Sequence, residues 1–160
     1  MPRREGDAVA IGKPGVRVPT HRAMPKPRKT SFLGARAART IGLDFEISIF
    51  ERSLEWEPDD AEVLDSLGHA YTARGLFEKG LEVDRKLTRL DPTNYTFAYN
   101  LACSLSLLGR IDEAFTALAR SIELGFRDLR LLAADPDLKA VRTDPRFFSL
   151  VEKATKLAAS

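Results

Sequence analysis

The sequence predicts an all-α protein, a short right-handed solenoid of antiparallel helix hairpins. From residue 41 onward, apolar residues recur at intervals of three and four, as they do on one face of a helix. The segments marked in this way are separated by two to four residues that contain glycine or proline, which forces neighbouring helices to run antiparallel. The whole pattern also repeats with a period of about 34 residues. No segment shows the sustained alternation of polar and apolar residues that a strand would need.

The first predicted helix covers residues 41–57 and caps the N-terminal end of the array. Its apolar face consists of Leu43, Ile47, Phe50 and Leu54. Pro58 ends it, because proline cannot continue a helical ladder. Asp59 and Asp60 then stand where the N-cap of a second helix belongs.

Two helix pairs follow, over residues 61–94 and 95–128. In the first pair, the apolar stripe that includes Leu67 and Tyr71 ends at Gly75, and a second stripe ends at Pro92. In the second pair the corresponding stripes end at Gly109 and Gly125. Glycine is favoured directly after a helix because it adopts the left-handed conformation without strain. The two pairs are therefore two copies of one helix–turn–helix unit.

Shifting the chain by one period places Leu67 on Leu101, Gly68 on Ala102 and Gly80 on Ala114. Small residues at these positions let the two helices of a pair approach closely. In this respect the sequence resembles the tetratricopeptide-repeat family, whose period is also about 34 residues. The matching residues are Leu64, Leu67, Gly68, Tyr71, Gly80, Leu87 and Pro92 in the first pair and Leu101, Ala102, Leu105, Ala114, Leu118 and Ser121 in the second. The resemblance implies a scaffold that binds a protein or peptide on its concave face.

Residues 129–158 are predicted to cap the C-terminal end of the array. Asp135-Pro136 and Asp144-Pro145 each combine an N-cap aspartate with a proline in the first helical turn. A short helix over 137–142 and a longer one over 146–157 are expected. Such a segment covers the apolar face that the last repeat of a solenoid would otherwise expose.

Residues 1–40 form a basic arm with a different composition. The arm holds ten lysines and arginines, two acidic residues and five of the nine prolines. Its net charge is +8, whereas residues 41–160 carry −6. Because the first thirty residues are poor in large apolar side chains, we expect the arm to be disordered, with no more than a frayed helical turn over residues 31–40. The alternative function of the chain is association with nucleic acid or another anionic surface through this arm.

The candidate binding residues lie on the first helix of each pair, on the stripe that faces away from the partner helix. The resemblance implies that this stripe lines the concave face. Its members are Glu62, Asp65, His69, Thr72, Thr96, Tyr99, Asn100, Cys103 and Ser106. Some members of the family clamp a terminal carboxylate with lysine, arginine and asparagine. Asn100 fits that pattern, but Asp65 and His69 replace the lysine and asparagine it needs.

Other chemistry has little support in the sequence. The chain has two histidines and one cysteine, with no spacing typical of a metal site, and it lacks a phosphate-binding glycine motif. His69 and Cys103 are one period apart and occupy equivalent positions, but a cysteine nucleophile would also need an oxyanion site. We expect no catalytic activity, no cofactor, no bound metal and no membrane segment. Cytoplasmic location is the default expectation, and the oligomeric state stays open.

Overall fold

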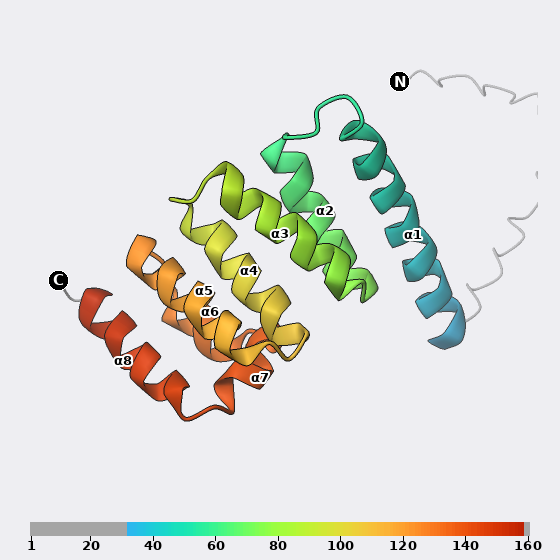
Figure 1. The fold of residues 1–160 in the computed structure, drawn as a ribbon. Coiled ribbons are helices and arrows are strands. Elements are labelled where there is room, and N and C mark those ends of the chain that lie inside the picture. The colour runs from blue at the N-terminus through green and yellow to red at the C-terminus, as the bar shows by residue number, and fades with distance from the viewer. Residues whose placement is uncertain (1–31, 159–160) are drawn as a thin grey trace, which may run out of the picture.

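The structure, a computed structural model, describes residues 32–158 and contains only helices over that range (Figure 1). In chain order these are α1 (Phe32–Ser53), α2 (Ala61–Arg74), α3 (Phe77–Leu90), α4 (Tyr95–Leu107), α5 (Ile111–Leu124), α6 (Leu129–Ala134), the 3-10 helix η1 (Pro136–Leu138), α7 (Lys139–Arg142) and α8 (Arg146–Ala158). The all-α fold predicted from the sequence is confirmed.

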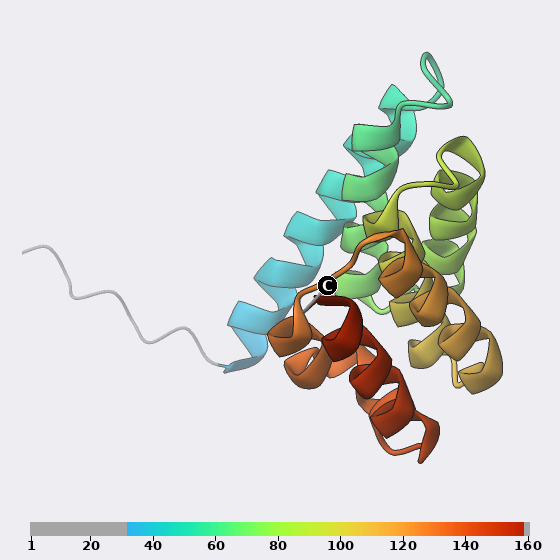
Figure 2. The same ribbon diagram turned by 90° about the vertical axis from the view of Figure 1, so that its left-hand side faces the viewer.

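The central helices form two stacked antiparallel pairs, α2 with α3 and α4 with α5 (Figures 1 and 2). Ala61 and Tyr95, the first residues of α2 and α4, are one period apart, and so are Phe77 and Ile111 at the start of α3 and α5. Each helix packs against the next one along the chain from α1 to α5. The two helix pairs therefore repeat with the period predicted from the sequence.

The ends of the helices follow the predicted capping signals. The Asp60 carboxylate accepts hydrogen bonds from the backbone N–H groups of Glu62 and Val63, at 3.0 and 3.1 Å. Asn94 caps α4 in the same way. After the first helix of each pair, Gly75 and Gly109 adopt φ values of 83° and 72°. Only glycine reaches this left-handed region without strain, so these residues turn the chain back on itself.

The predicted start of the first helix was wrong. α1 begins at Phe32, not at residue 41, so residues 32–40 belong to the helix and not to the arm. These residues are rich in alanine and arginine, which favour helix. The residue equivalent to Gly75 is here Ile41, and no left-handed turn interrupts the helix. α1 also ends at Ser53 rather than at residue 57, and hydrogen-bonded turns lead on toward Pro58. The remaining arm, residues 1–31, lies outside the described residues.

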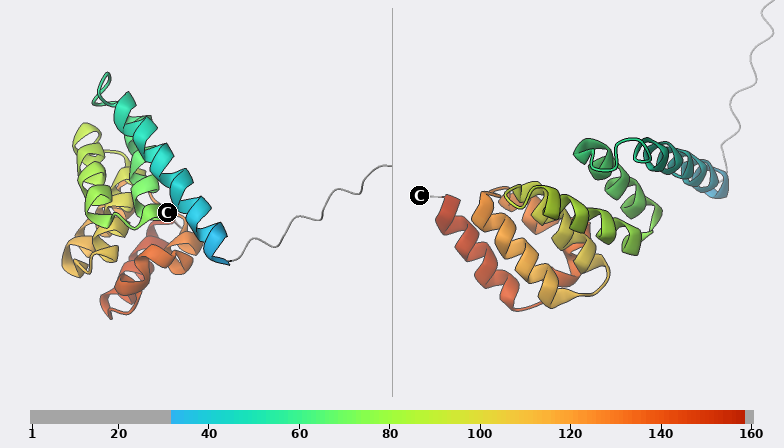
Figure 3. Two further views of the ribbon diagram at one scale, coloured as in Figure 1. Left: turned by 90° about the vertical axis from the view of Figure 1, so that its right-hand side faces the viewer. Right: turned by 45° about the horizontal axis from the view of Figure 1, so that its top comes forward.

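One face of α1 packs on α2 through Ile47, which is 7% exposed. The opposite face presents Ile41, Phe45 and Ile49 to solvent. α1 thus forms the outer edge of the array, at the end opposite to α8 (Figure 3).

The C-terminal segment folds back over the second helix pair. η1 and α7 both pack on α4, and α6 packs against α8. The carboxylates of Asp135 and Asp144 accept hydrogen bonds from the backbone N–H groups of Asp137 and Arg146, each at 2.9 Å. Both predicted N-caps are therefore present, and the segment covers the end of the solenoid.

The buried apolar side chains form two clusters. The smaller one joins α1, α2 and α3 around Leu87, and the larger one joins α4, α5 and the C-terminal segment around Leu118 and Ile122. Leu81 of α3 belongs to the larger cluster, and Phe97 of α4 packs against the smaller one. These two side chains link the clusters.

Gly68 and Gly80 allow α2 and α3 to approach closely. A Cβ atom at Gly68 would lie 3.4 Å from both Val83 Cγ1 and Asp84 Oδ1, and a Cβ atom at Gly80 would lie 3.3 Å from Thr72 Oγ1. A methyl group at position 68 would therefore be in ordinary van der Waals contact, and a longer side chain would have no room.

Gly68→Leu should lower the free energy of unfolding by about 1–3 kcal/mol, the usual cost of overpacking. Gly68→Ala should be close to neutral, because its methyl group fits and alanine favours helix. Urea denaturation followed by circular dichroism measures both. Gly42→Leu is the matched control, since nothing lies within 4 Å of a Cβ atom there. Equal effects of leucine and alanine at position 68 would contradict the close approach.

Candidate functional site

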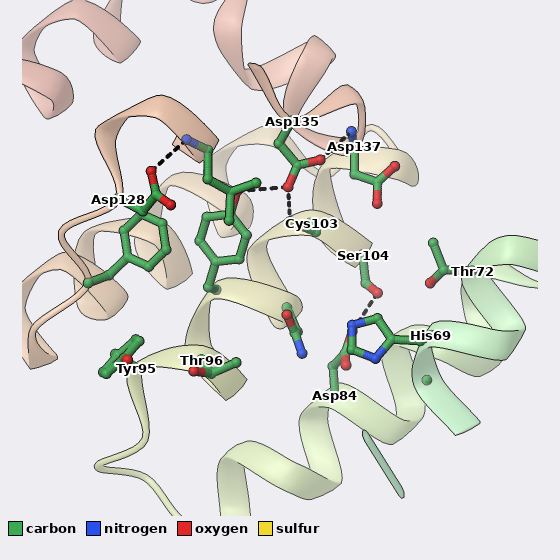
Figure 4. A pocket seen from close by; sticks show the side chains of 15 residues that line it. His69, Thr72, Asp84, Tyr95, Thr96, Cys103, Ser104, Asp128, Asp135 and Asp137 are labelled. Carbon is green, nitrogen blue, oxygen red and sulfur yellow. Dashed lines mark hydrogen bonds between the residues drawn. The ribbon is translucent and has the colours of Figure 1, made fainter. Parts of the chain in front are cut away.

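A groove with a volume of about 510 Å³ lies between α2, α3, α4 and the C-terminal segment (Figure 4). Both first helices of the pairs, α2 and α4, contribute residues to it. The lining residues are Gly68, His69, Thr72, Asp84, Tyr95, Thr96, Tyr99, Asn100, Cys103, Ser104, Phe126, Asp128, Leu131, Asp135 and Asp137.

The structure brings six of the nine candidate residues together in this groove. They are His69, Thr72, Thr96, Tyr99, Asn100 and Cys103. Asp65 lies beside the groove, where its carboxylate accepts a hydrogen bond from Asn100 Nδ2 at 2.9 Å and lies 3.7 Å from His69 Nδ1. Asn100 therefore already has a partner within the molecule.

Two candidate residues lie elsewhere. Glu62 is exposed in the first turn of α2 and does not line the groove. Ser106 is 2% exposed and lies under the segment that contains Pro136 and Lys139. Ser106 was a candidate because it lies on the same helical stripe as Thr96, Tyr99 and Cys103. In the structure, η1 and α7 cover that end of α4.

Tyr99 joins α4 to the C-terminal segment. Its hydroxyl donates a hydrogen bond to Asp135 Oδ2 at 2.7 Å, and its ring stacks on Phe126 at a centroid distance of 4.5 Å. Burial, with Asp135 as acceptor, raises the pKa of the Tyr99 hydroxyl. Because the side chain is only 5% exposed, its main contribution is to the shape of the groove.

Cys103 lies at the same carboxylate, with its Sγ 3.7 Å from Asp135 Oδ2. Burial raises the pKa of the Cys103 thiol, and the charge of Asp135 raises it further. A catalytic cysteine needs the opposite shift, toward the thiolate. This environment therefore disfavours a nucleophilic role beside His69.

Asp84 forms the floor of the groove. The residue is 5% exposed, and Ser104 Oγ donates a hydrogen bond to its Oδ2 at 2.5 Å. Burial raises the pKa of the Asp84 carboxyl to about 6, against the opposing effects of Ser104 and His69. The folded protein thus holds a carboxyl group that is partly protonated around pH 6 and ionised above it.

The groove is acidic, which the nine residues predicted from the sequence did not indicate. Four aspartates line it, at positions 84, 128, 135 and 137, and among the described lining residues His69 is the only basic one. Burial and the charge of Asp135 raise the pKa of Asp137. For Asp84 the sequence did contain a signal. The equivalent residue in the next repeat is the buried Leu118, so an acidic side chain stands at a core position of the repeat. The three other aspartates belong to the C-terminal segment, whose position the period does not determine.

Within residues 32–158, no group of three or more histidine, cysteine or acidic side chains is placed to hold a metal ion. Over the same range, none of the helices combines the length and the apolar character needed to cross a membrane.

Comparison with known proteins agrees with the class of fold described above. Residues 95–124 match the model of the tetratricopeptide repeat. This segment corresponds to α4 and α5. The resemblance predicted from the repeat period is thereby confirmed.

Three curated relatives share parts of the chain. The CTR9 homolog of Arabidopsis thaliana is 56% identical over 43 residues, which are 27% of this chain and 4% of that protein. A chloroplastic protein of Arabidopsis thaliana is 25% identical over 129 residues, 79% of this chain and 37% of that protein. The BBSome complex member BBS4 of Bos taurus is 31% identical over 74 residues, 46% of this chain and 14% of that protein. The chain thus spans much less than two thirds of each relative.

Solved structures of MamA share the fold. Two of them match with TM-scores of 0.58 and 0.60, at 22% and 24% identity. The matches cover 76% and 74% of this chain and 71% of each MamA chain. Together, the repeat and the fold support a protein–protein interaction module.

Tyr99→Phe should lower the free energy of unfolding by about 1–2 kcal/mol, because it leaves the half-buried Asp135 oxygen without its tyrosine donor. Tyr95→Phe is the matched control, since Tyr95 is 45% exposed and its ring also contacts Phe126. Thermal denaturation at neutral pH compares the two variants. If both lose the same stability, the hydroxyl of Tyr99 does not hold the C-terminal segment.

Asp84→Asn should raise the free energy of unfolding at pH 7.5 and leave it nearly unchanged at pH 4. On folding, the pKa of Asp84 rises from 3.8 to about 6, so the ionised carboxylate is penalised in the folded state. The penalty is absent below pH 3.8, the pKa of the unfolded state, because the carboxyl is then protonated in both states. Above the folded-state pKa of about 6 the penalty is complete and amounts to roughly 3 kcal/mol. Asparagine keeps the shape and an acceptor for Ser104, so we expect a gain of about 1–3 kcal/mol.

Urea denaturation of this variant at pH 4, 5, 6 and 7.5 measures the effect. Glu82→Gln removes the same charge from an exposed position on α3 and is the control. A gain for Asp84→Asn that does not grow between pH 4 and pH 6 would refute the assignment.

Proposed function

We propose that the chain is a non-catalytic adaptor that binds a segment of a protein partner in the groove between α2, α4 and the C-terminal segment. The observation that carries the proposal is the convergence of both helix pairs on one cavity of about 510 Å³. A cavity of this size holds several side chains of an extended peptide.

The groove offers the two kinds of contact that peptide recognition uses. Two of the lining residues, Tyr95 and Leu131, are 45% and 42% exposed and provide apolar surface. Partly exposed aromatic residues at the centre of an interface commonly supply much of the binding energy. Thr72 and Thr96 add hydroxyl groups that can bond a peptide backbone.

The fold is typical of proteins without catalytic activity, and the raised pKa of Cys103 agrees with that interpretation. BBS4 is a member of a complex, and an adaptor role in an assembly fits that relative.

Association of the basic arm with nucleic acid stays a prediction, because residues 1–31 lie outside the described residues. The cytoplasmic location stays a prediction as well.

Thr96→Arg should abolish capture of the partner, because a long side chain at this exposed groove position would occupy the space for the peptide. The partner is first isolated by affinity capture on the full-length protein and identified by mass spectrometry. Its affinity for the wild-type protein and for the variant is then measured by calorimetry. We expect a loss of at least tenfold.

Thr116→Arg is the matched control, since Thr116 is an exposed threonine on α5, outside the groove. Circular dichroism establishes that both variants are folded. If Thr116→Arg weakens binding as much as Thr96→Arg, or if neither does, the partner binds another surface.

A further inference from the structure

Among the described residues, most of the acidic side chains that form ion pairs lie outside the groove. Arg74 pairs with Asp44, Lys86 with Asp59, and Arg146 with both Asp112 and Asp144. Lys153 pairs with Glu123. None of the four groove aspartates has such a partner among residues 32–158. The cavity therefore concentrates negative charge that no lysine or arginine of the described chain neutralises.

Two of the four carboxylates are already used within the fold. Asp135 caps η1 and accepts the hydroxyl of Tyr99. Asp128 caps α6 by accepting the backbone N–H of Leu131 at 2.9 Å. These two aspartates have structural partners that account for their positions.

Asp84 and Asp137 differ from them. Ser104 is the only described donor to the Asp84 carboxylate, and it binds Oδ2, so Oδ1 receives no hydrogen bond although the residue is only 5% exposed. No described group donates to the Asp137 carboxylate, which lines the same cavity. The two side chains enter the groove from opposite sides, Asp84 from α3 and Asp137 from η1, with Ser104 between them (Figure 4). Asp84, which is largely buried, and Asp137, which is half-buried, therefore both have acceptor capacity left for a ligand.

We infer that the groove takes up a lysine or arginine side chain of the protein partner, with the carboxylates of Asp84 and Asp137 as its counterions. This inference rests on the proposed function and specifies the chemistry of the partner. An ammonium group carries three donors and a guanidinium carries five, so either has enough donors to serve more than one acceptor in the groove. Charge-assisted hydrogen bonds of this kind are stronger than neutral ones, and partial burial strengthens them further.

The same geometry predicts discrimination between peptides. A glutamate or a terminal carboxylate would meet four acidic side chains with only His69 to oppose them. Like charges at close quarters are strongly unfavourable in an interface, so acidic segments should be rejected. The groove therefore selects against the carboxylate ligands that other members of the family clamp.

The test uses nuclear magnetic resonance of the ¹⁵N-labelled full-length protein at pH 7.5. Two acetylated and amidated octapeptides of alanine and serine serve as probes, one with two lysines and one with two glutamates at the same positions. We expect the lysine peptide to shift the amide signals of His69, Ser104 and Asp137 in a saturable way. The glutamate peptide should leave these signals in place.

Asp84→Asn and Asp137→Asn should each weaken binding of the lysine peptide about tenfold. Glu82→Gln, which removes one charge from the exposed face of α3, should change it less than twofold. Melting curves verify that each variant is folded. If both groove variants bind the lysine peptide as well as the wild type does, or if both peptides bind alike, the inference is wrong.

The partner isolated above separates this inference from the proposed function. If Thr96→Arg abolishes capture while Asp84→Asn and Asp137→Asn retain full affinity, the groove is the binding site but does not recognise a cation. If Thr96→Arg retains capture, the proposed function fails, and the peptide titration alone then decides whether the groove binds lysine.

Discussion

The carboxylate of Asp135 holds the C-terminal segment in place, and the groove depends on that position. It accepts a backbone hydrogen bond at the start of η1 and the hydroxyl hydrogen bond of Tyr99. The guanidinium of Arg142 contacts the backbone carbonyl of the same residue. These contacts act together with the burial of Leu138 in the larger cluster to fix η1 against α4, and so they place the wall of the cavity that carries Asp137. One aspartate thus serves as a helix cap, a link between two parts of the chain and a determinant of the site.

The sequence was sufficient to predict the helices and their pairing, because each depends on local rules. Gly75 and Gly109 have the left-handed conformation that their positions after a helix suggest, and Asp60 caps α2. α1 was predicted too short because residues 32–40 have few large apolar side chains. Helix propensity extended it to Phe32, although residues 36–39 are exposed. The absence of a turn-forming glycine at Ile41 was the signal that could have shown this.

The groove was predictable only in part, for a related reason. His69, Thr72 and Cys103 could be placed together because the repeat period puts equivalent positions of successive first helices side by side. The walls contributed by Asp128 and Asp137 follow from how the C-terminal segment folds back, which no periodicity describes. Ser106 shows the same limit, since η1 and α7 bury a residue that the stripe alone would leave open. Asp84 could have been found, because an acid replaces the large apolar residue that the repeat has at Leu118.

The division of the core into two clusters has a consequence for how the array opens. Separating α3 from α4 breaks the packing of Leu81 and Phe97 across the boundary and the hydrogen bond from Ser104 to Asp84, but it leaves each cluster otherwise whole. Splitting either cluster internally would expose completely buried side chains such as Leu87 or Ile122. The boundary between the pairs is therefore a natural plane of subglobal unfolding, and the smaller unit of α1, α2 and α3 should exchange its amide protons before the larger one does. Because Asp84 and Ser104 meet at this boundary, a ligand bound there would clamp the two folding units together.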